Sequence, residues 1–295
     1  MTTSDTPETY RRIDDLLPAH WESTYVEMRD STRLHAYLAG DSQEPAVILL
    51  HGFMSAGFQW MRVAMALEAE FYLVLPDMRG HGYSDGVENG FSLDILTQDL
   101  ADVVDALELD KPIVLGHSLG AEIAVRFGAT YPDVPRAIIL EDPPMRSFNA
   151  GMFRQTDWYK DWIAQMQALK TQPHEERMTN GRAFLPPGTT LPQETDYVTQ
   201  IEATALFNLD VLDHSEDMDY RAASPELIGK LSAPILLLTA DSERGGSALP
   251  EGVKAITASW QDGQHIHFEG AGHFIHFEQL DPFIDAIRVF LSAES

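Results

Sequence analysis

Gly116-His117-Ser118-Leu119-Gly120 is the most informative stretch of this sequence for its architecture. It follows the apolar run Pro112–Leu115 and opens the helical run Leu119–Tyr131, so it predicts a sharp turn between a buried strand and a helix. So tight a turn requires small residues at its flanks, and both flanking residues are glycine. The serine then stands above the strand end, at a helix N-terminus whose backbone N–H groups stabilise negative charge. We therefore predict that Ser118 is a nucleophile.

Short apolar runs on both sides of this turn predict buried strands, and helical runs separate most of them. The expected strands are Thr24–Arg29, Arg33–Ala39, Ala46–Leu50, Tyr72–Leu75, Ile113–Leu115, Ala137–Leu140, Ile235–Leu238 and Ile266–Glu269. The expected helices are Phe58–Ala69, Ser92–Leu107, Leu119–Tyr131 and a last one from Pro282 to Leu291. The first two strands are expected to form a hairpin. Continuous apolar strands that alternate with helices indicate an α/β fold with a parallel sheet covered on both faces.

The strand spacing is interrupted once, because residues 141–234 contain no clear buried strand. The interval carries several aromatic residues, namely Trp158, Trp162, Phe184 and Phe207. Structureless loops of such length are rare in compact domains. We therefore predict a mostly helical insertion that covers a site. The expected domains are a core of residues 1–144 and 231–295 and a helical cap of residues 145–230.

Composition excludes several classes of function. The formal charge of −26 repels nucleic acid and anionic membranes, so neither is expected as a partner. Adaptation to a saline host stays open as a reason for the acidic excess. The absence of cysteine excludes disulfides and thiolate sites. Residues 1–20 lack the pattern of a signal peptide, and no apolar run reaches the roughly 18 residues of a membrane span, which favours a cytoplasmic protein. Without a phosphate-loop or HExxH motif, we expect no cofactor and no metal.

A second turn supplies partners for the chemistry of the first. His51-Gly52-Phe53 follows the apolar run Ala46–Leu50. Acyl transfer needs preorganised donors for the oxyanion that develops in the transition state. The backbone N–H groups of Phe53 and Leu119 are the natural pair for this role. Trp60 and His117 lie near these turns in sequence, and we predict that they bind substrate.

A serine hydroxyl needs a base that takes its proton. His273, in Gly270-Ala271-Gly272-His273-Phe274, follows the last expected strand and lies C-terminal to the candidate acids, as the order Ser, acid, His requires. We predict His273 as the base, with His276 as the alternative. The other histidines near glycine turns, His51, His81 and His117, are expected to shape loops. His265 and His267 flank the last strand without the carboxylates of a metal site.

Together these motifs resemble the α/β-hydrolase superfamily, over roughly residues 24–142 and 232–292. The resemblance also rests on the stretch from Pro76 to Ser84, which includes Asp77-Met78-Arg79-Gly80-His81-Gly82 and would be a structural loop. It implies an eight-stranded sheet with a cap inserted after the sixth strand. Haloalkane dehalogenases and epoxide hydrolases of this fold use an Asp nucleophile. Because the nucleophile position here is Ser118, those two activities are not expected.

The acid of the triad stays open between three carboxylates. The resemblance places it either after the seventh strand, where Glu243 stands with Asp241 two residues earlier, or after the sixth, where Asp142 stands. Asp142 precedes Pro143, and proline favours an extended conformation in the residue before it. We therefore prefer Asp142, on the expectation of an extended backbone at that position.

The predicted function is hydrolysis of a carboxylic ester or lactone by a serine hydrolase through an acyl-enzyme. The same residues permit C–C bond hydrolysis, or activity of the perhydrolase and haloperoxidase type. A ligand receptor that retains the triad is the alternative outside enzymes. The expected partner is a small-molecule ester or lactone, and the sequence leaves the oligomeric state open.

Overall fold

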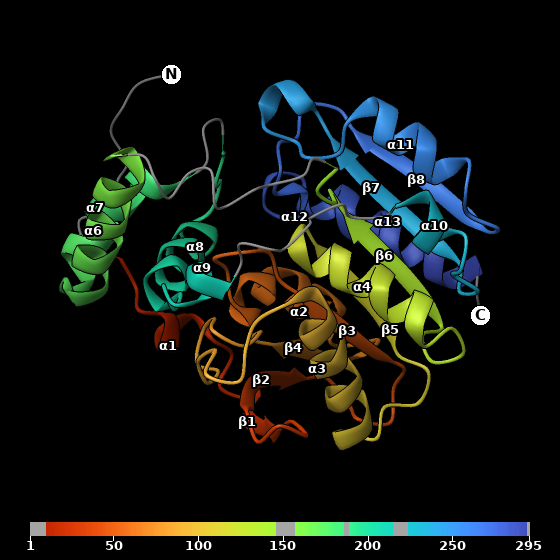
Figure 1. Cartoon of the computed structure of the whole chain (residues 1–295), viewed down its shortest axis with the longest axis horizontal. Coiled ribbons are helices and arrows are strands. Elements are labelled where there is room, and N and C mark those ends of the chain that lie inside the picture. The colour runs from red at the N-terminus through yellow and green to blue at the C-terminus, as the bar shows by residue number, and fades with distance from the viewer. Residues whose placement is uncertain (1–9, 146–156, 186–188, 215–223, 294–295) are drawn as a thin grey trace.

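The structure of the 295-residue chain is a computed structural model that describes residues 10–145, 157–185, 189–214 and 224–293. Its centre is one eight-stranded sheet with the strand order β1-β2-β4-β3-β5-β6-β7-β8 (Figure 1). The strands are β1 (Glu22–Glu27), β2 (Arg33–Ala39), β3 (Ala46–Leu50), β4 (Tyr72–Pro76), β5 (Ile113–His117), β6 (Ala137–Glu141), β7 (Ile235–Ala240) and β8 (Gly263–Phe268). The predicted opening hairpin is β1 and β2, which pair antiparallel, whereas β3 to β8 are mutually parallel.

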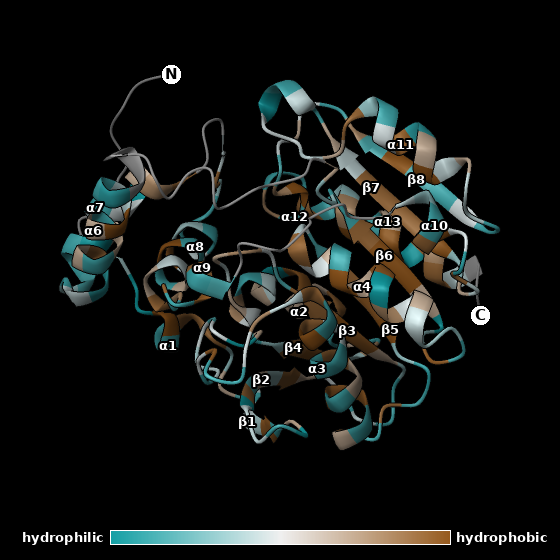
Figure 2. Cartoon of the chain, viewed as in Figure 1, coloured by the Kyte–Doolittle hydropathy of each residue, from teal (hydrophilic) through white to brown (hydrophobic). Residues whose placement is uncertain are grey.

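Burial explains why the central strands are unbroken apolar runs in the sequence. Every residue of β3, β5, β6 and β7 is buried, because helices cover both faces of the sheet. The longest core helices are α3 (Leu93–Ala106), α4 (Leu119–Thr130) and α13 (Leu280–Ala293), with the shorter α2 (Met61–Leu67) and α11 (Pro250–Thr257). Figure 2 shows the apolar strands in the middle of the molecule and hydrophilic residues on the outward side of the helices. The α/β-hydrolase fold class predicted from sequence is confirmed.

Two apolar layers lie on the two faces of the sheet. Val103 of α3 and Ile123 of α4 pack on one face, while Met61 of α2 and Phe283 of α13 pack on the other. These helices thereby shield both faces of the sheet from solvent. The carboxyl ends of the parallel strands share one edge of the sheet, and the loops that follow them carry Ser118, Asp142 and His273.

The interval between β6 and β7 is helical wherever the structure describes it. It contains α6 (Asp157–Thr171), α7 (His174–Gly181), η2 (Arg182–Phe184), α8 (Glu194–Leu206), α9 (Val211–His214) and α10 (Pro225–Ile228). Figure 1 shows α6 and α7 beyond the edge of the core, with α8 and α9 between them and the sheet. A small cluster around Met178, Tyr197 and Ile201 holds α7 to α8. The division into a core and a separate cap stays a prediction. No helix of the described residues is long and apolar enough to cross a membrane.

Polar contacts join α8 to the core. Arg62 Nη1 lies 2.7 Å from Asp196 Oδ2, and Gln59 Nε2 donates to Gln200 Oε1 over 3.0 Å. Gln59 stands in η1 (Gly57–Trp60), the turn that follows the Gly52 loop. Burial raises the pKa of Asp196 to about 6, and the nearby Arg62 guanidinium opposes that rise. These contacts seat α8 beside the carboxyl edge of the sheet.

Candidate active site

Ser118 occupies a strained turn between β5 and α4. Its backbone has φ 51° and ψ −115°, outside the conformations that ordinary residues favour. The N–H of Ser118 donates to the carbonyl of Glu141 over 3.0 Å, and its own carbonyl accepts from Ala121 and Glu122 in the first turn of α4. The residue is partly exposed although its neighbours are buried. The turn therefore presents the serine above the sheet edge.

The flanking glycines are required by close backbone contacts. A Cβ at Gly116 would lie 2.2 Å from the carbonyl oxygen of Gly120, and a Cβ at Gly120 would lie 2.3 Å from that of Leu50. Neither backbone atom can move without disturbing a strand or a helix. The strand-to-helix turn thus depends on the two glycines that the sequence singled out.

His273 and Asp142 form a close imidazole–carboxylate pair. Nδ1 of His273 lies 2.6 Å from Oδ2 of Asp142, and the side chain of Asp142 is fully buried while that of His273 is 17% exposed. A carboxylate only accepts hydrogen bonds, so Nδ1 carries the proton and Nε2 is the free face of the ring. The backbone N–H of Ser247 donates to Oδ2 of Asp142 over 2.6 Å, and that of Ala248 donates to Oδ1 over 3.2 Å. Hydrogen bonds therefore hold both carboxylate oxygens of Asp142.

The backbone of Asp142 differs from the expected conformation. Its φ is 41°, in the left-handed region, so the prediction of an extended backbone before Pro143 is wrong. The N–H of Asp142 still donates to the carbonyl of Leu238 on β7 over 2.8 Å, which extends the strand pairing of β6 by one residue. Bonds from Ser247 and Ala248 hold the carboxylate beside His273. Tertiary hydrogen bonds thus outweigh the local preference, as aspartate tolerates this region better than most residues.

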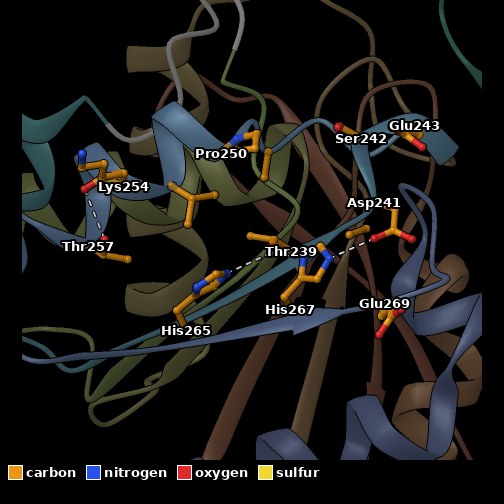
Figure 3. A pocket seen from close by; sticks show the side chains of 13 residues that line it. Thr239, Asp241, Ser242, Glu243, Pro250, Lys254, Thr257, His265, His267 and Glu269 are labelled. Atoms are coloured by element: carbon orange, nitrogen blue, oxygen red, sulfur yellow. Dashed lines mark hydrogen bonds and ion pairs between the residues drawn. The ribbon is translucent and has the colours of Figure 1, made fainter.

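The other two acid candidates lie elsewhere. Asp241 contacts His267 instead of His273, with Oδ1 2.9 Å from Nε2, and its Oδ2 accepts the N–H of Gly270 over 2.8 Å (Figure 3). Glu243 is exposed in η3 (Ser242–Arg244). Both residues line an open cavity of about 630 Å³ over β7, β8 and α11, whose described lining includes neither Ser118 nor His273.

The Gly52 loop passes directly beside Ser118. A Cβ at Gly52 would lie 3.4 Å from Cβ of Ser118 and 2.8 Å from Nδ1 of His117. Two buried histidines hold this loop: His51 accepts the N–H of Met78 at Nε2, and His81 accepts the N–H of Met54 at Nε2. The sequence expectation for these two histidines, that they shape loops, matches these contacts.

Burial keeps both loop histidines neutral. Desolvation lowers the pKa of His51 and lowers that of His81 to about 3. In each ring Nδ1 faces a carbonyl, of Gly52 for His51 and of Arg79 for His81, so Nδ1 carries the single proton and Nε2 accepts. Backbone carbonyls therefore determine both tautomers. The two bonds accepted at Nε2 then hold the loop that carries Phe53 to the loop after β4.

The two residues predicted to bind substrate are both buried. Trp60 has no exposed surface, and its ring lies 4.4 Å from that of His276 and 6.3 Å from that of Phe283. His117 is 1% exposed, donates from Nε2 to the carbonyl of His273 over 2.9 Å, and has a pKa well below 6.5 because of desolvation. Both residues are therefore packed inside the protein, and substrate contact by either stays a prediction.

The interval between β6 and β7 reaches the site through Phe207, which follows α8. The Phe207 ring is fully buried and lies 5.1 Å from the ring of Phe53 and 4.9 Å from that of His81. Trp162 and Phe184 are partly buried against the core cluster, whereas the side chain of Trp158 lies outside the described residues. Phe207 is thus an aromatic residue of this interval that touches the Gly52 loop.

Sequence reasoning missed three residues around the pair, and it considered a fourth, His276, only as an alternative base. Ser247 and Ala248 hold Asp142 through backbone N–H groups, which no side-chain pattern reveals. Glu141 and His276 form a second buried pair, with 2.8 Å between Oε2 and Nδ1. A charged residue at the end of an otherwise apolar strand was the available signal for Glu141. Among the described residues, no group of three or more His, Asp or Glu side chains could hold a metal ion.

Comparison with known proteins places this geometry in a family. A profile of the alpha/beta hydrolase family matches residues 47–286. N-formylmaleamate deformylase from Pseudomonas putida is 27% identical over 266 residues, which are 86% of this chain and 91% of that enzyme. Mouse epoxide hydrolase 4 is 31% identical over 146 residues, 46% of this chain and 41% of that protein. The chain thus spans less than half the length of that epoxide hydrolase.

Solved structures show the same fold. The enol-lactonase from Burkholderia xenovorans superposes with a TM-score of 0.73 at 18% identity, over 91% of this chain and all of that one. From the family match over most of its length, the chain belongs to the alpha/beta hydrolase family.

Proposed function

We propose that the protein is a serine hydrolase that cleaves a carboxylic ester or lactone through an acyl-enzyme. The observation that carries the proposal is the buried Asp142 carboxylate 2.6 Å from His273, on the same sheet edge as the strained Ser118 turn. A carboxylate at Nδ1 fixes the imidazole with Nε2 available as a base, and stabilises the imidazolium when it forms. Ser118, His273 and Asp142 are then the nucleophile, the base and the acid.

The steps follow from these positions. His273 takes the proton of Ser118 as the hydroxyl attacks the carbonyl carbon, and the N–H groups of Phe53 and Leu119 stabilise the oxyanion. His273 returns the proton to the leaving alcohol. Water then attacks the acyl carbon while His273 takes its proton, and this proton passes to the Ser118 oxygen as the acyl–serine bond breaks and the carboxylic acid is released. Within the described residues Ser118 and His273 form no hydrogen bond, so this bond must form when substrate binds, as is common for catalytic hydrogen bonds.

Phe207 supports an apolar binding pocket. Its fully buried ring packs on Phe53 at the proposed oxyanion loop, so it would shape the apolar surroundings of the reacting carbonyl through Phe53. An acyl or alcohol group with apolar surface suits such surroundings. Phe207→Ala should change the preference among ester chain lengths more than the rate on a small acetate ester.

Amide hydrolysis is a second candidate, because the likeness to N-formylmaleamate deformylase extends over 86% of this chain and 91% of that enzyme. The same acyl-enzyme serves both substrates, but an amine leaving group needs a full proton from His273 before it departs. Matched p-nitrophenyl esters and p-nitroanilides would separate the two, since their acyl groups are identical.

The test is covalent labelling followed by turnover. A fluorophosphonate should label wild type at Ser118, and Ser118→Ala should lose both labelling and ester turnover by several orders of magnitude while it keeps its melting temperature. Labelling at another residue, or a Ser118→Ala variant with more than about a tenth of wild-type kcat, would contradict the proposal. Specific binding of an ester without turnover by wild type would favour a receptor.

A further inference from the structure

A second acid–imidazole pair lies directly beside Asp142 and His273. Glu141 and His276 have side chains 0% and 1% exposed. Oε1 of Glu141 accepts the backbone N–H of His276 over 2.9 Å, and Nδ1 of His276 lies 2.8 Å from both carboxylate oxygens. The two acids are consecutive at the end of β6, and the two histidines are three residues apart around the start of α12 (Ile275–Glu278).

Burial of Glu141 and His276 costs free energy unless hydrogen bonds replace the contacts that both side chains lose with water. A buried carboxylate loses its hydration, and only well-placed partners compensate the loss. The His276 ring is confined on its other side by Trp60 at 4.4 Å and Phe283 at 6.1 Å, so it cannot swing away from Glu141. An apolar pair of the same size would fill this space without that cost. Glu141 and the two aromatic rings therefore hold the His276 side chain in place, although its buried Nε2 has no hydrogen-bond partner in the described part of the chain.

Glu141 touches both parts of the proposed catalytic machinery. Its backbone carbonyl accepts the N–H of Ser118 over 3.0 Å, which holds the nucleophile turn. Its carboxylate holds the segment that follows His273. One residue thus connects the serine to the histidine loop.

Three neighbouring strands hold that loop by side chains at their carboxyl ends. His117 of β5 donates to the carbonyl of His273, and Glu141 of β6 accepts the N–H of His276. Asp241, directly after β7, accepts the N–H of Gly270. The His117 ring lies 4.5 Å from the His273 ring and 5.4 Å from the His276 ring, so the three imidazoles form one packed group. Glu141 is the one carboxylate of this set that is fully buried.

We propose that Glu141 and His276 are positioning residues, which set the distance between Ser118 and the imidazole of His273. This inference rests on the proposed serine hydrolase function. Neither residue would touch the substrate; they act through the loop and the turn that they hold. A misplacement of about 1 Å at a reacting group costs about a hundredfold in rate, so a small change at this pair should appear in kcat.

The test uses Glu141→Gln, which keeps the shape but cannot accept hydrogen bonds on both oxygens. The matched control is Glu202→Gln in α8, because Glu202 forms a pair of similar burial with His174, 2.9 Å from Oε1 to Nδ1, away from the His273 loop. Steady-state turnover of p-nitrophenyl acetate and melting temperature are measured for both. We expect Glu141→Gln to lower kcat about 10- to 100-fold, with KM within about twofold. Glu202→Gln should keep wild-type kcat, with a similar change in melting temperature.

Several outcomes would overturn the inference. One is kcat within twofold of wild type for a folded Glu141→Gln; another is an equal loss of kcat in Glu202→Gln. If Glu141→Gln does not fold, His276→Gln takes its place with the same expected loss of kcat. Failure of both variants to fold would assign the pair to stability alone. Fluorophosphonate labelling of wild type separates the two proposals: if Ser118 is labelled and Glu141→Gln is unimpaired, only the positioning role fails, whereas an unlabelled Ser118 removes the proposed function itself.

Discussion

The carboxyl ends of β6 and β7 lie side by side, and each carries a carboxylate that binds a histidine. Asp142 after β6 is fully buried and contacts His273, whereas the side chain of Asp241 after β7 is 28% exposed and contacts His267. The difference arises from the partners: Asp142 receives two N–H groups from the loop after β7, while Asp241 receives one from the loop after β8. The loop after β7 thus holds the Asp142 carboxylate at the end of β6. The two carboxylate–histidine pairs are of the same kind but differ in burial.

Among substitutions at these two strand ends, Asp142→Asn should have the largest effect on kcat. An amide beside Nδ1 favours the wrong tautomer of His273, and the same change in the triad of a serine protease lowers kcat by about 10⁴. We expect kcat for p-nitrophenyl acetate to fall by about three to four orders of magnitude with KM little changed. A variant with near-wild-type kcat would remove Asp142 from the triad.

Asp241→Asn should have a much smaller effect on the same reaction. The amide oxygen can still accept the N–H of Gly270, so the His273 loop loses only part of its support. We expect kcat to fall by less than about tenfold. A loss as large as that of Asp142→Asn would show that the acid function belongs to the β7 end and reverse the comparison.

The stability contribution of Asp241 should depend on pH at the acidic end. The N–H of Gly270 and the neighbouring His267 lower the pKa of Asp241 below its ordinary value of 3.8. The contribution is therefore fully present above pH 3.8 and is lost as the pH falls through the lowered pKa. Urea unfolding of wild type and Asp241→Asn should differ by a constant amount from pH 7 to about pH 5 and converge at lower pH. A difference that grows on acidification would contradict this.

Glu243→Gln should have the smallest effect. Its side chain is exposed, and exposed substitutions away from special contacts change stability by about 0.5 kcal/mol or less. Both kcat and melting temperature are expected to match wild type. A crippled Glu243→Gln with an active Asp142→Asn would require the loop after β7 to rearrange when substrate binds.

The fold followed from local patterns in the sequence. Apolar runs predicted the central strands, because a strand buried on both faces has no polar positions, and paired glycines identified the turn at Ser118. The order of motifs along the chain led to the prediction of His273 as the base among eleven histidines. The strand and turn signals each lie within a few residues of the feature that they predict.

The choice among the three acids depends on tertiary contacts. Asp142, Asp241 and Glu243 each follow a buried strand, and local sequence favoured an extended Asp142 that the structure does not have. The pairing with His273 depends on N–H groups 105 and 106 residues away, at Ser247 and Ala248. The pairing of Glu141 with His276 was not predicted either, since the two residues are 135 positions apart and only the fold brings them together. Backbone donors carry no signature in the sequence, so which carboxylate they hold is determined by how the strand ends meet.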